Sequence, residues 1–191
     1  LHPEAHGNFR DDALSSRAAS GQVYDLFYRH PTPRLDEVSL RILVPDALWV
    51  TIIREPVSRF LSAYTFVKRL SRRYSVHQLV DNMHTLSPGD ANTFCDNFAF
   101  VLGGGGELNT TELVDRLDRH YLVLVQDDMR KSLALLADRA GIDTVGVERI
   151  GRARASKTRK PHCDEACRFK ILSCNQVDSA LYEYFKRKFA T

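Results

Sequence analysis

The chain has 191 residues, of which 43% are hydrophobic and 27% are charged, with a formal net charge of +3. These values are typical of one globular domain with a sizeable core, and the charge is too small to indicate a nucleic-acid partner by itself. No apolar run reaches the roughly 18 residues of a membrane span, and no signal peptide is visible. Because the chain begins at Leu1 rather than Met, we expect a piece of a longer protein.

The amino-terminal part contains one candidate catalytic residue. Residues 1–22 are polar without a clear period, and we interpret them as a loop or a short helix. The run from Val23 to Tyr28 predicts a short strand, and the two prolines of His30-Pro31-Thr32-Pro33 keep the next segment extended. His30 therefore follows a strand end, either as a solvated loop residue or as a general base. A short helix is predicted from Asp36 to Leu43.

The segment from Trp49 to Tyr64 is the most informative of the chain. The apolar run Trp49–Ile53 predicts a strand covered on both faces. Pro56 suits the first turn of a helix that places Ser62 about two turns on. Arg54 would then lie at the carboxyl edge of a sheet, beside a helix start whose free N–H groups and dipole favour an anion. The pattern predicts either a phosphate site at Arg54 and Ser62 or a plain strand-turn-helix with a surface arginine.

The remaining elements follow from period and from turn residues. Gly103–Gly106 is a connector and not a phosphate cradle, because Glu107 and Leu108 follow it where a Walker loop has Lys and Ser or Thr. Asp127 or Asp128 can cap the start of the predicted helix Met129–Ala140, and Gly141 ends it. We predict helices over Ser75–Leu86, Thr110–Arg119, Met129–Ala140 and Asp164–Phe189, a turn over Ser87–Asp90, and a strand over Tyr121–Gln126.

Four cysteines leave the compartment open: Cys95, Cys163, Cys167 and Cys174. An even count permits two disulfides in three possible pairings. Three of them lie near His162, but C-x3-C-x6-C does not repeat the paired C-x2-C spacing of structural zinc sites, so we expect no metal. Asn109-Thr110-Thr111 is a sequon, which predicts glycosylation of Asn109 in a secretory lumen.

One loop is strongly basic. Arg149–Lys160, RIGRARASKTRK, holds six basic residues among twelve. Such a run is typical of a solvated loop, or of a patch that binds nucleic acid.

The motif R-E-P-x-x-R-x-x-S-x-Y, from Arg54 to Tyr64, resembles the motif with which sulfotransferases hold the 3′-phosphate of PAPS, 3′-phosphoadenosine-5′-phosphosulfate. The longer string LVPDALWVTIIREPVSRFLSAYTF resembles the galactose 3-O-sulfotransferase family, which includes galactosylceramide sulfotransferases, and then uronyl 2-O-sulfotransferases. The segments HPTPRLDEV, YLVLVQDDMRKSLALL and VDSALYEYFKRKF resemble further parts of the family. The likeness covers residues 23–191 and implies one α/β domain, incomplete at its amino end, with three layers and a mostly parallel sheet of the P-loop-hydrolase type.

The resemblance implies a role for each candidate residue. His30 becomes the general base, and the residues expected to bind the donor are Arg54, Arg59, Ser62, Arg152, Arg154, Lys157 and Arg159. The family also holds the 5′-phosphosulfate on a lysine-containing loop near the start of its catalytic domain. No lysine precedes Lys68 here, so we expect that loop to lie upstream and the chain alone to turn over little substrate.

The implied function is transfer of a sulfuryl group from PAPS to a sugar hydroxyl, expected to be the 3-OH of galactose in a glycolipid or glycoprotein glycan, without a metal. The alternatives are a uronyl 2-O-sulfotransferase, an inactive module that binds PAPS or its product PAP (3′-phosphoadenosine-5′-phosphate), and a basic domain that binds nucleic acid or glycan. The expected partner is a glycan and not nucleic acid. The expected location is the Golgi lumen, as a type II membrane protein anchored upstream.

Overall fold

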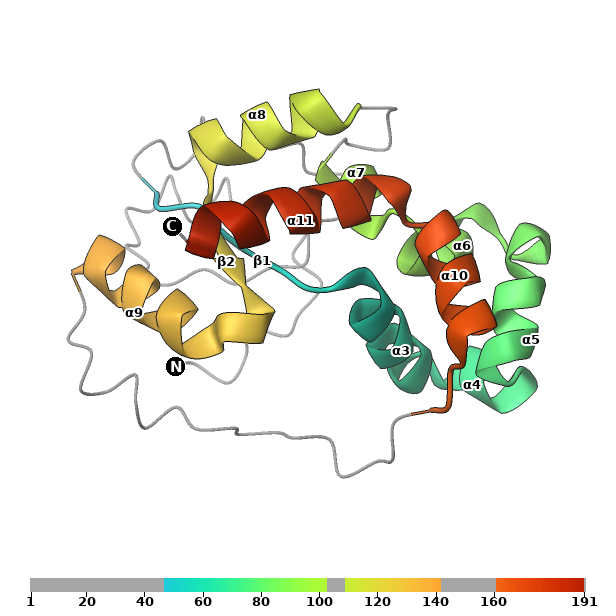
Figure 1. The fold of residues 1–191 in the computed structure, drawn as a ribbon. Helices are drawn as coiled ribbons and strands as arrows, with labels where there is room; N and C mark the ends of the chain where they lie inside the picture. The colour runs from blue at the N-terminus through green and yellow to red at the C-terminus, as the bar shows by residue number, and fades with distance from the viewer. Residues whose placement is uncertain (1–46, 103–108, 142–160, 191) are drawn as a thin grey trace, which may run out of the picture. The chain divides into compact units, whose positions relative to one another are not determined.

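A computed structural model describes residues 47–102, 109–141 and 161–190 (Figure 1). The chain divides into two compact units, Leu1–Ala47 and Leu48–Thr191, and all described residues but Ala47 belong to the second. The predicted Val23–Tyr28 strand, Asp36–Leu43 helix and Gly103–Gly106 connector lie outside the described residues.

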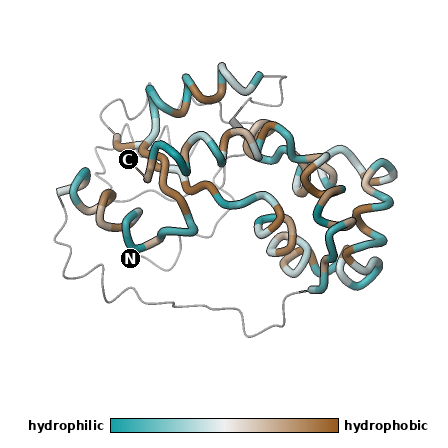
Figure 2. Tube along the Cα trace, in the orientation of Figure 1, coloured by the Kyte–Doolittle hydropathy of each residue, from teal (hydrophilic) through white to brown (hydrophobic). Residues whose placement is uncertain are grey.

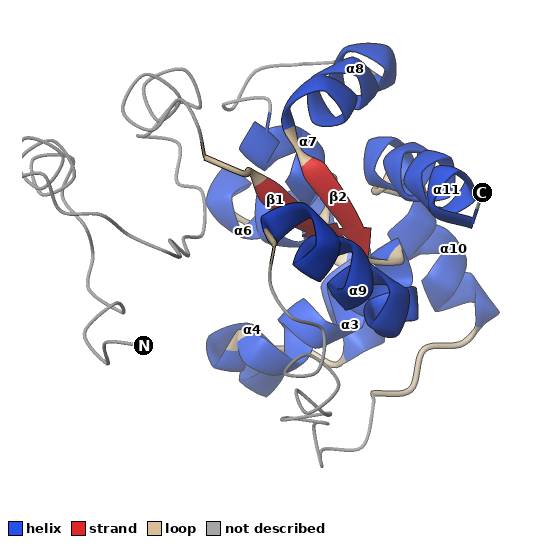
Figure 3. Cartoon of the chain, turned by 90° about the vertical axis from the view of Figure 1, so that its left-hand side faces the viewer, coloured by secondary structure: helices blue, strands red, loops and turns tan. Residues whose placement is uncertain are grey.

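The two described strands form a small parallel sheet. Strand β1 (Val50–Ile53) pairs with β2 (Leu122–Val125), as Figure 3 shows. In the register of the pair, Ile53 lies opposite Val125. Most other described elements are helices, so this part is α/β with a two-stranded sheet. The prediction that β1 is covered on both faces is wrong, because Val50 and Ile52 are 38% and 47% exposed. They share one face, and only Ile53 of the strand is fully buried.

Six short helices lie between β1 and residue 103: α3 (Pro56–Phe66), α4 (Lys68–Arg73), α5 (Val76–Asp81), the 3-10 helix η1 (Met83–Thr85), α6 (Pro88–Phe94) and α7 (Asn97–Leu102). The predicted helix Ser75–Leu86 is shorter, because α5 ends at Asp81. The predicted turn Ser87–Asp90 is instead a helix start. Ser87 accepts a hydrogen bond from the Asp90 N–H (3.3 Å), and Pro88 occupies the first turn of α6.

The carboxyl-terminal elements match the predictions with one exception. They are α8 (Thr110–His120), the 3-10 helix η2 (Gln126–Asp128), α9 (Met129–Ala140), α10 (Glu165–Ser173) and α11 (Gln176–Ala190). Gly141 adopts the left-handed conformation (φ 65°) that ends α9. The exception is the helix predicted over Asp164–Phe189. It breaks at Cys174 and Asn175 into α10 and α11, which run in different directions (Figures 1 and 3).

Buried apolar side chains form two clusters, and Figure 2 shows hydrophobic residues in brown along the strands and parts of the helices. The first joins α3, α5, α6 and α10 through Val57, Phe60, Leu79, Phe94 and Ile171. The second packs α8 and α11 against the strands through Ile53, Leu113, Leu117, Val125, Leu181, Tyr182 and Phe185. Among the described residues, no helix combines the length and the apolar character needed to span a bilayer.

Two disulfides connect the four cysteines. Cys95 pairs with Cys174 across 79 positions of sequence, and Cys163 pairs with Cys167 across four. The first joins the α6–α7 connection to the α10–α11 break. The second begins just before α10 and ends inside it.

Candidate functional site

The carboxyl ends of the two parallel strands meet at one edge of the sheet, where α/β proteins usually bind ligands. Because Ile53 lies opposite Val125, Arg54 and Gln126 are the first residues beyond that edge. Arg54 is half-buried, and its guanidinium forms no hydrogen bond or ion pair with any residue that the structure describes. A half-buried, uncommitted guanidinium can bind an anionic ligand through two parallel N–H donors.

The start of α3 is already occupied by a carboxylate of the chain itself. Glu55 caps the helix by accepting hydrogen bonds from the N–H groups of Val57 (3.1 Å) and Ser58 (2.6 Å). Pro56 has no N–H, and the Arg59 N–H donates to the Glu55 carbonyl (2.9 Å). The expectation that free N–H groups of this helix favour an anion is therefore wrong. An anion at this edge would have to rely on side chains, with Glu55 opposing it.

Ser62 lies on the exposed face of α3, one helical turn beyond Ser58. Its carbonyl accepts the Thr65 hydroxyl (2.7 Å), while its own hydroxyl has no partner among the described residues. Arg54 and Ser62 are thus both available for a ligand. The chain connects them through the capped first turn of α3.

Arg59, the third predicted donor-binding residue of this segment, directs its guanidinium into the protein. Nη1 donates to the Thr93 carbonyl (3.0 Å), and Nη2 donates to the Phe94 carbonyl (2.6 Å) and to Asn175 Oδ1 (2.8 Å). Nε lies 3.7 Å from Asp178 Oδ2, and only 13% of the side chain is exposed. Arg59 therefore contacts three other elements of the fold.

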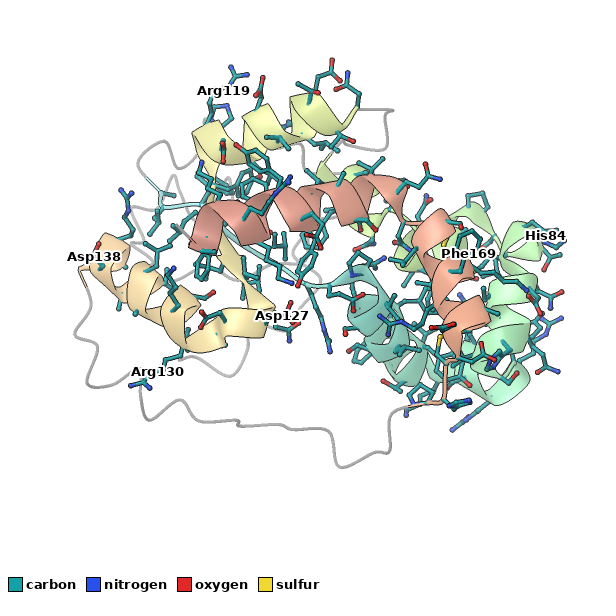
Figure 4. All side chains as sticks on the ribbon, viewed as in Figure 1. His84, Arg119, Asp127, Arg130, Asp138 and Phe169 are labelled. Carbon is teal, nitrogen blue, oxygen red and sulfur yellow. A yellow bond between two sulfur atoms is a disulfide. The ribbon has the colours of Figure 1, made fainter. Side chains whose placement is uncertain are left out.

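The β2 side of the edge is acidic. Asp127 and Asp128 follow β2 after Gln126, and Figure 4 shows Asp127 at this end of the strand. Asp128 caps α9 through the Lys131 N–H (3.2 Å), which decides between the two predicted caps. Tyr182 of α11 donates its hydroxyl to Asp127 Oδ2. Burial, together with that hydrogen bond and with the charges of Asp127 and Glu55, raises the pKa of Tyr182, so its hydroxyl stays protonated.

Ser132 fixes the position of this acidic turn. Its hydroxyl is fully buried, accepts the Val125 N–H (3.0 Å) and donates to the Val125 carbonyl (2.8 Å). The last residue of β2 is thereby connected to the second turn of α9. Sequence reasoning missed both Ser132 and Tyr182. The available signal was a polar residue on the apolar face of each helix, which marks a buried hydrogen bond.

The remaining predicted site residues fall into two groups. Asn109 is exposed at the start of α8, where its side chain accepts the Glu112 N–H (3.0 Å), so a cap and a predicted glycosylation site coincide. The others lie outside the described residues: His30, Arg152, Arg154, Lys157 and Arg159. In the described part, no three or more His, Cys, Asp or Glu side chains are arranged to hold a metal ion.

A pocket of about 400 Å³ lies away from this edge, beside the amino end of β2. It contains none of the predicted site residues. Its walls come from β2, α9 and the last turns of α11, and its charged lining residues are Asp118, Lys131, Arg139 and Lys188. Lys188 pairs with Asp118 (2.7 Å) and Lys131 donates to the Phe189 carbonyl, so two of the three cations are engaged within the protein.

Comparison with known proteins adds no relative. No family model matches the chain, and neither the curated proteins nor the solved structures include a match. The functional argument therefore depends on the residues at the carboxyl edge of the sheet.

Proposed function

We propose that this chain carries the 3′-phosphate-binding part of a PAPS-dependent carbohydrate sulfotransferase, in a three-layer fold of the sulfotransferase type. The observation that supports it is the Arg54 guanidinium at the end of a parallel strand, which has no partner among the described residues and is followed on α3 by the exposed Ser62 hydroxyl. A guanidinium offers two parallel donors to one phosphate, and the serine adds a third donor.

In the proposed reaction, a sugar hydroxyl attacks the sulfur of PAPS. The new O–S bond forms as the bond between sulfur and the 5′-phosphate oxygen breaks, and the hydroxyl proton passes to His30. Sulfuryl transfer of this kind depends on alignment and on stabilising the charge of the departing phosphate. Arg54 and Ser62 would contribute alignment, since the 3′-phosphate is remote from the reacting sulfur.

The charges of the described edge place a condition on this proposal. Residues 54–55 follow β1 and residues 126–128 follow β2. Among these five residues, Glu55, Asp127 and Asp128 are acidic and Arg54 is basic. Binding of a nucleotide with several negative charges therefore requires further cations. The basic residues of Arg149–Lys160, which are predicted to bind the donor, would supply them. The affinity for the donor should therefore fall steeply as the salt concentration rises.

The disulfides support the proposed location in the Golgi lumen. Cys95–Cys174 and Cys163–Cys167 use every cysteine of the chain. Disulfides persist in secretory compartments and are rare in the reducing cytosol. The acceptor, the 3-OH of galactose in a glycolipid or glycoprotein glycan, is proposed on the sequence resemblance alone.

The test is calorimetric titration of the chain with PAP and, separately, with adenosine 5′-phosphate. We expect PAP to bind more tightly, and Arg54→Ala to reduce this advantage by about ten- to a hundredfold, as for the loss of a charged hydrogen bond. Arg72→Ala is the matched control, because Arg72 is exposed on α4 and has no partner among the described residues. Equal binding of both nucleotides by a chain that circular dichroism shows to be folded would rule the proposal out.

A further inference from the structure

Arg59 belongs to a buried polar network that joins α3 to α6, α7, α11 and the break between α10 and α11. The Thr93 and Phe94 carbonyls lie in the last turn of α6, where a helix leaves carbonyls without intrahelical partners and carries partial negative charge. The guanidinium thus serves as a carboxyl-terminal cap for α6. Its third acceptor, Asn175, is fully buried at the break between α10 and α11.

The network continues into a mutual capping arrangement of α7 and α11. The carboxylate of Asp178, in the first turn of α11, accepts the N–H groups of Phe98 and Ala99 at the start of α7 (3.1 and 3.2 Å). Asp96, just before α7, accepts the Asp178 N–H in return (3.0 Å) and donates its own N–H to Asn175 Oδ1 (2.9 Å). Arg59 supplies the positive charge beside these two buried or half-buried carboxylates.

One disulfide and one unusual backbone conformation hold the network in place. Cys95 and Cys174, the neighbours of Asp96 and Asn175, form a disulfide. Asp96 also has a positive φ of 38°, which a non-glycine residue adopts only when its surroundings require it. The acceptors that face Arg59 are therefore held by contacts that do not involve α3.

We propose that Arg59 is the positioning residue of the Arg54–Ser62 site and does not itself contact the nucleotide. The inference rests on the proposed function. Arg59 lies three residues before Ser62, and its N–H closes the first turn of α3 on Glu55, the neighbour of Arg54. The hydrogen bonds from its guanidinium to these fixed acceptors set how α3 is rotated about its axis. That rotation determines whether Ser62 faces the same ligand as Arg54.

An arginine is needed for this role because the acceptors lie in different directions. Nη1 and Nη2 together reach three oxygens, which an ammonium group on a single flexible stem cannot contact in the same geometry. Arg59→Lys keeps the charge and loses the fork. Asn175→Ala removes one acceptor from outside α3 and leaves every residue of the motif intact.

The readout is the ratio of PAP affinity to adenosine 5′-phosphate affinity. Loss of folded protein alone does not change this ratio, because it lowers the number of binding sites and not their affinity. We expect Arg59→Lys and Asn175→Ala each to lower the ratio by roughly tenfold, as displaced binding groups do. In a Ser62→Ala background, Arg59→Lys should cause no further loss, since both variants remove the Ser62 contact. Arg69→Lys, in the exposed ion pair with Asp90, is the control and should leave the ratio unchanged.

Two results would overturn the inference. A ratio unchanged by Arg59→Lys would show that α3 is positioned without the fork. A loss that adds fully to that of Ser62→Ala, with no effect of Asn175→Ala, would make Arg59 a direct phosphate ligand.

Hydrogen exchange separates failure of the inference from failure of the proposed function. We expect Arg59→Lys to speed exchange of the α3 amides while those of α9 keep their rates, because α9 is outside the network. If the wild-type chain shows no preference for the 3′-phosphate, the proposed function fails. The inference that Arg59 holds α3 in place is then tested by hydrogen exchange alone. Unchanged exchange rates of the α3 amides in Arg59→Lys would contradict it.

Discussion

Asp178 carries its carboxylate in a place where water is nearly absent, since the residue is 4% exposed. Burial raises its pKa above the ordinary 3.8, while Arg59 and the N–H groups of Phe98 and Ala99 act in the opposite direction. The folded chain therefore holds a proton on Asp178 at pH values where the unfolded chain has released it. A single residue thus makes folding dependent on pH.

The sign of this dependence can be tested with Asp178→Asn. The contribution of Asp178 to the free energy of unfolding should be fully present below pH 3.8 and should decline as pH rises through the raised pKa. The amide of the variant can still accept the α7 N–H groups but does not titrate. Urea unfolding measures the free energy of unfolding of both proteins across the acidic range. The value for wild type minus the value for Asp178→Asn should fall as pH rises. A difference that grows with pH would mean that Arg59 outweighs burial.

At the scale of the element, α3 combines a stabilising cap with an electrostatic cost to the proposed ligand. The Glu55 carboxylate accepts two N–H groups of the first turn and complements the helix dipole. It also follows Arg54 directly in sequence and lowers the attraction of that edge for an anion. Helix stability and anion binding therefore make opposite demands on this position.

Glu55→Gln should accordingly change two measurements in opposite directions. We expect the free energy of unfolding to fall by about 1 kcal/mol, as for a weakened cap, and PAP to bind more tightly because a negative charge is removed. The control is Glu112→Gln in α8, whose side chain also accepts an N–H at a helix start, from Asn109 (3.1 Å). It should lower stability without changing PAP affinity. Weaker PAP binding by Glu55→Gln would show that an ordered α3 start matters more than its charge.

Elements with local signals were predictable from the sequence. Pro56 in a first turn and Gly141 past a last turn correctly bounded α3 and α9. The break between α10 and α11 was not predictable, because Asn175 is held there by Arg59 and Asp96, which lie far away in sequence. The Glu55 cap was missed for a different reason. Caps are usually Ser, Thr, Asp or Asn, so a glutamate before a proline gave no recognisable signal.

The candidate site divides in the same way. The placement of Arg54 at the sheet edge followed from a rule about parallel strands and is consistent with the register of β1 and β2. The buried contacts of Arg59 depend on Thr93, Asn175 and Asp178. Spacing within one motif cannot show which of its polar residues faces a ligand and which faces the core.

At the scale of the whole molecule, the two disulfides differ in what they restrain. Cys95–Cys174 closes a loop of 79 positions between the α6–α7 connection and the α10–α11 break, whereas Cys163–Cys167 closes four positions at the start of α10. A cross-link stabilises a fold mainly by lowering the entropy of the unfolded chain, and the effect grows with the length of the loop. The long loop includes α7, α8, β2, α9 and α10, so this disulfide restrains most of the chain that follows α6.

Replacing each pair by alanine should therefore cost different amounts of stability. Chain entropy predicts a loss of about 4.5 kcal/mol for Cys95→Ala/Cys174→Ala and about 2 kcal/mol for Cys163→Ala/Cys167→Ala. Urea unfolding of the two double variants beside the oxidised wild type measures both values, and each variant keeps the other disulfide as an internal check. The larger loss should also speed hydrogen exchange in α6, α7 and the start of α11, because Asp96 and Asn175 lose the link that aligns them. Equal losses would instead indicate that native packing around each sulfur pair, and not loop length, sets the contribution of these disulfides to folding.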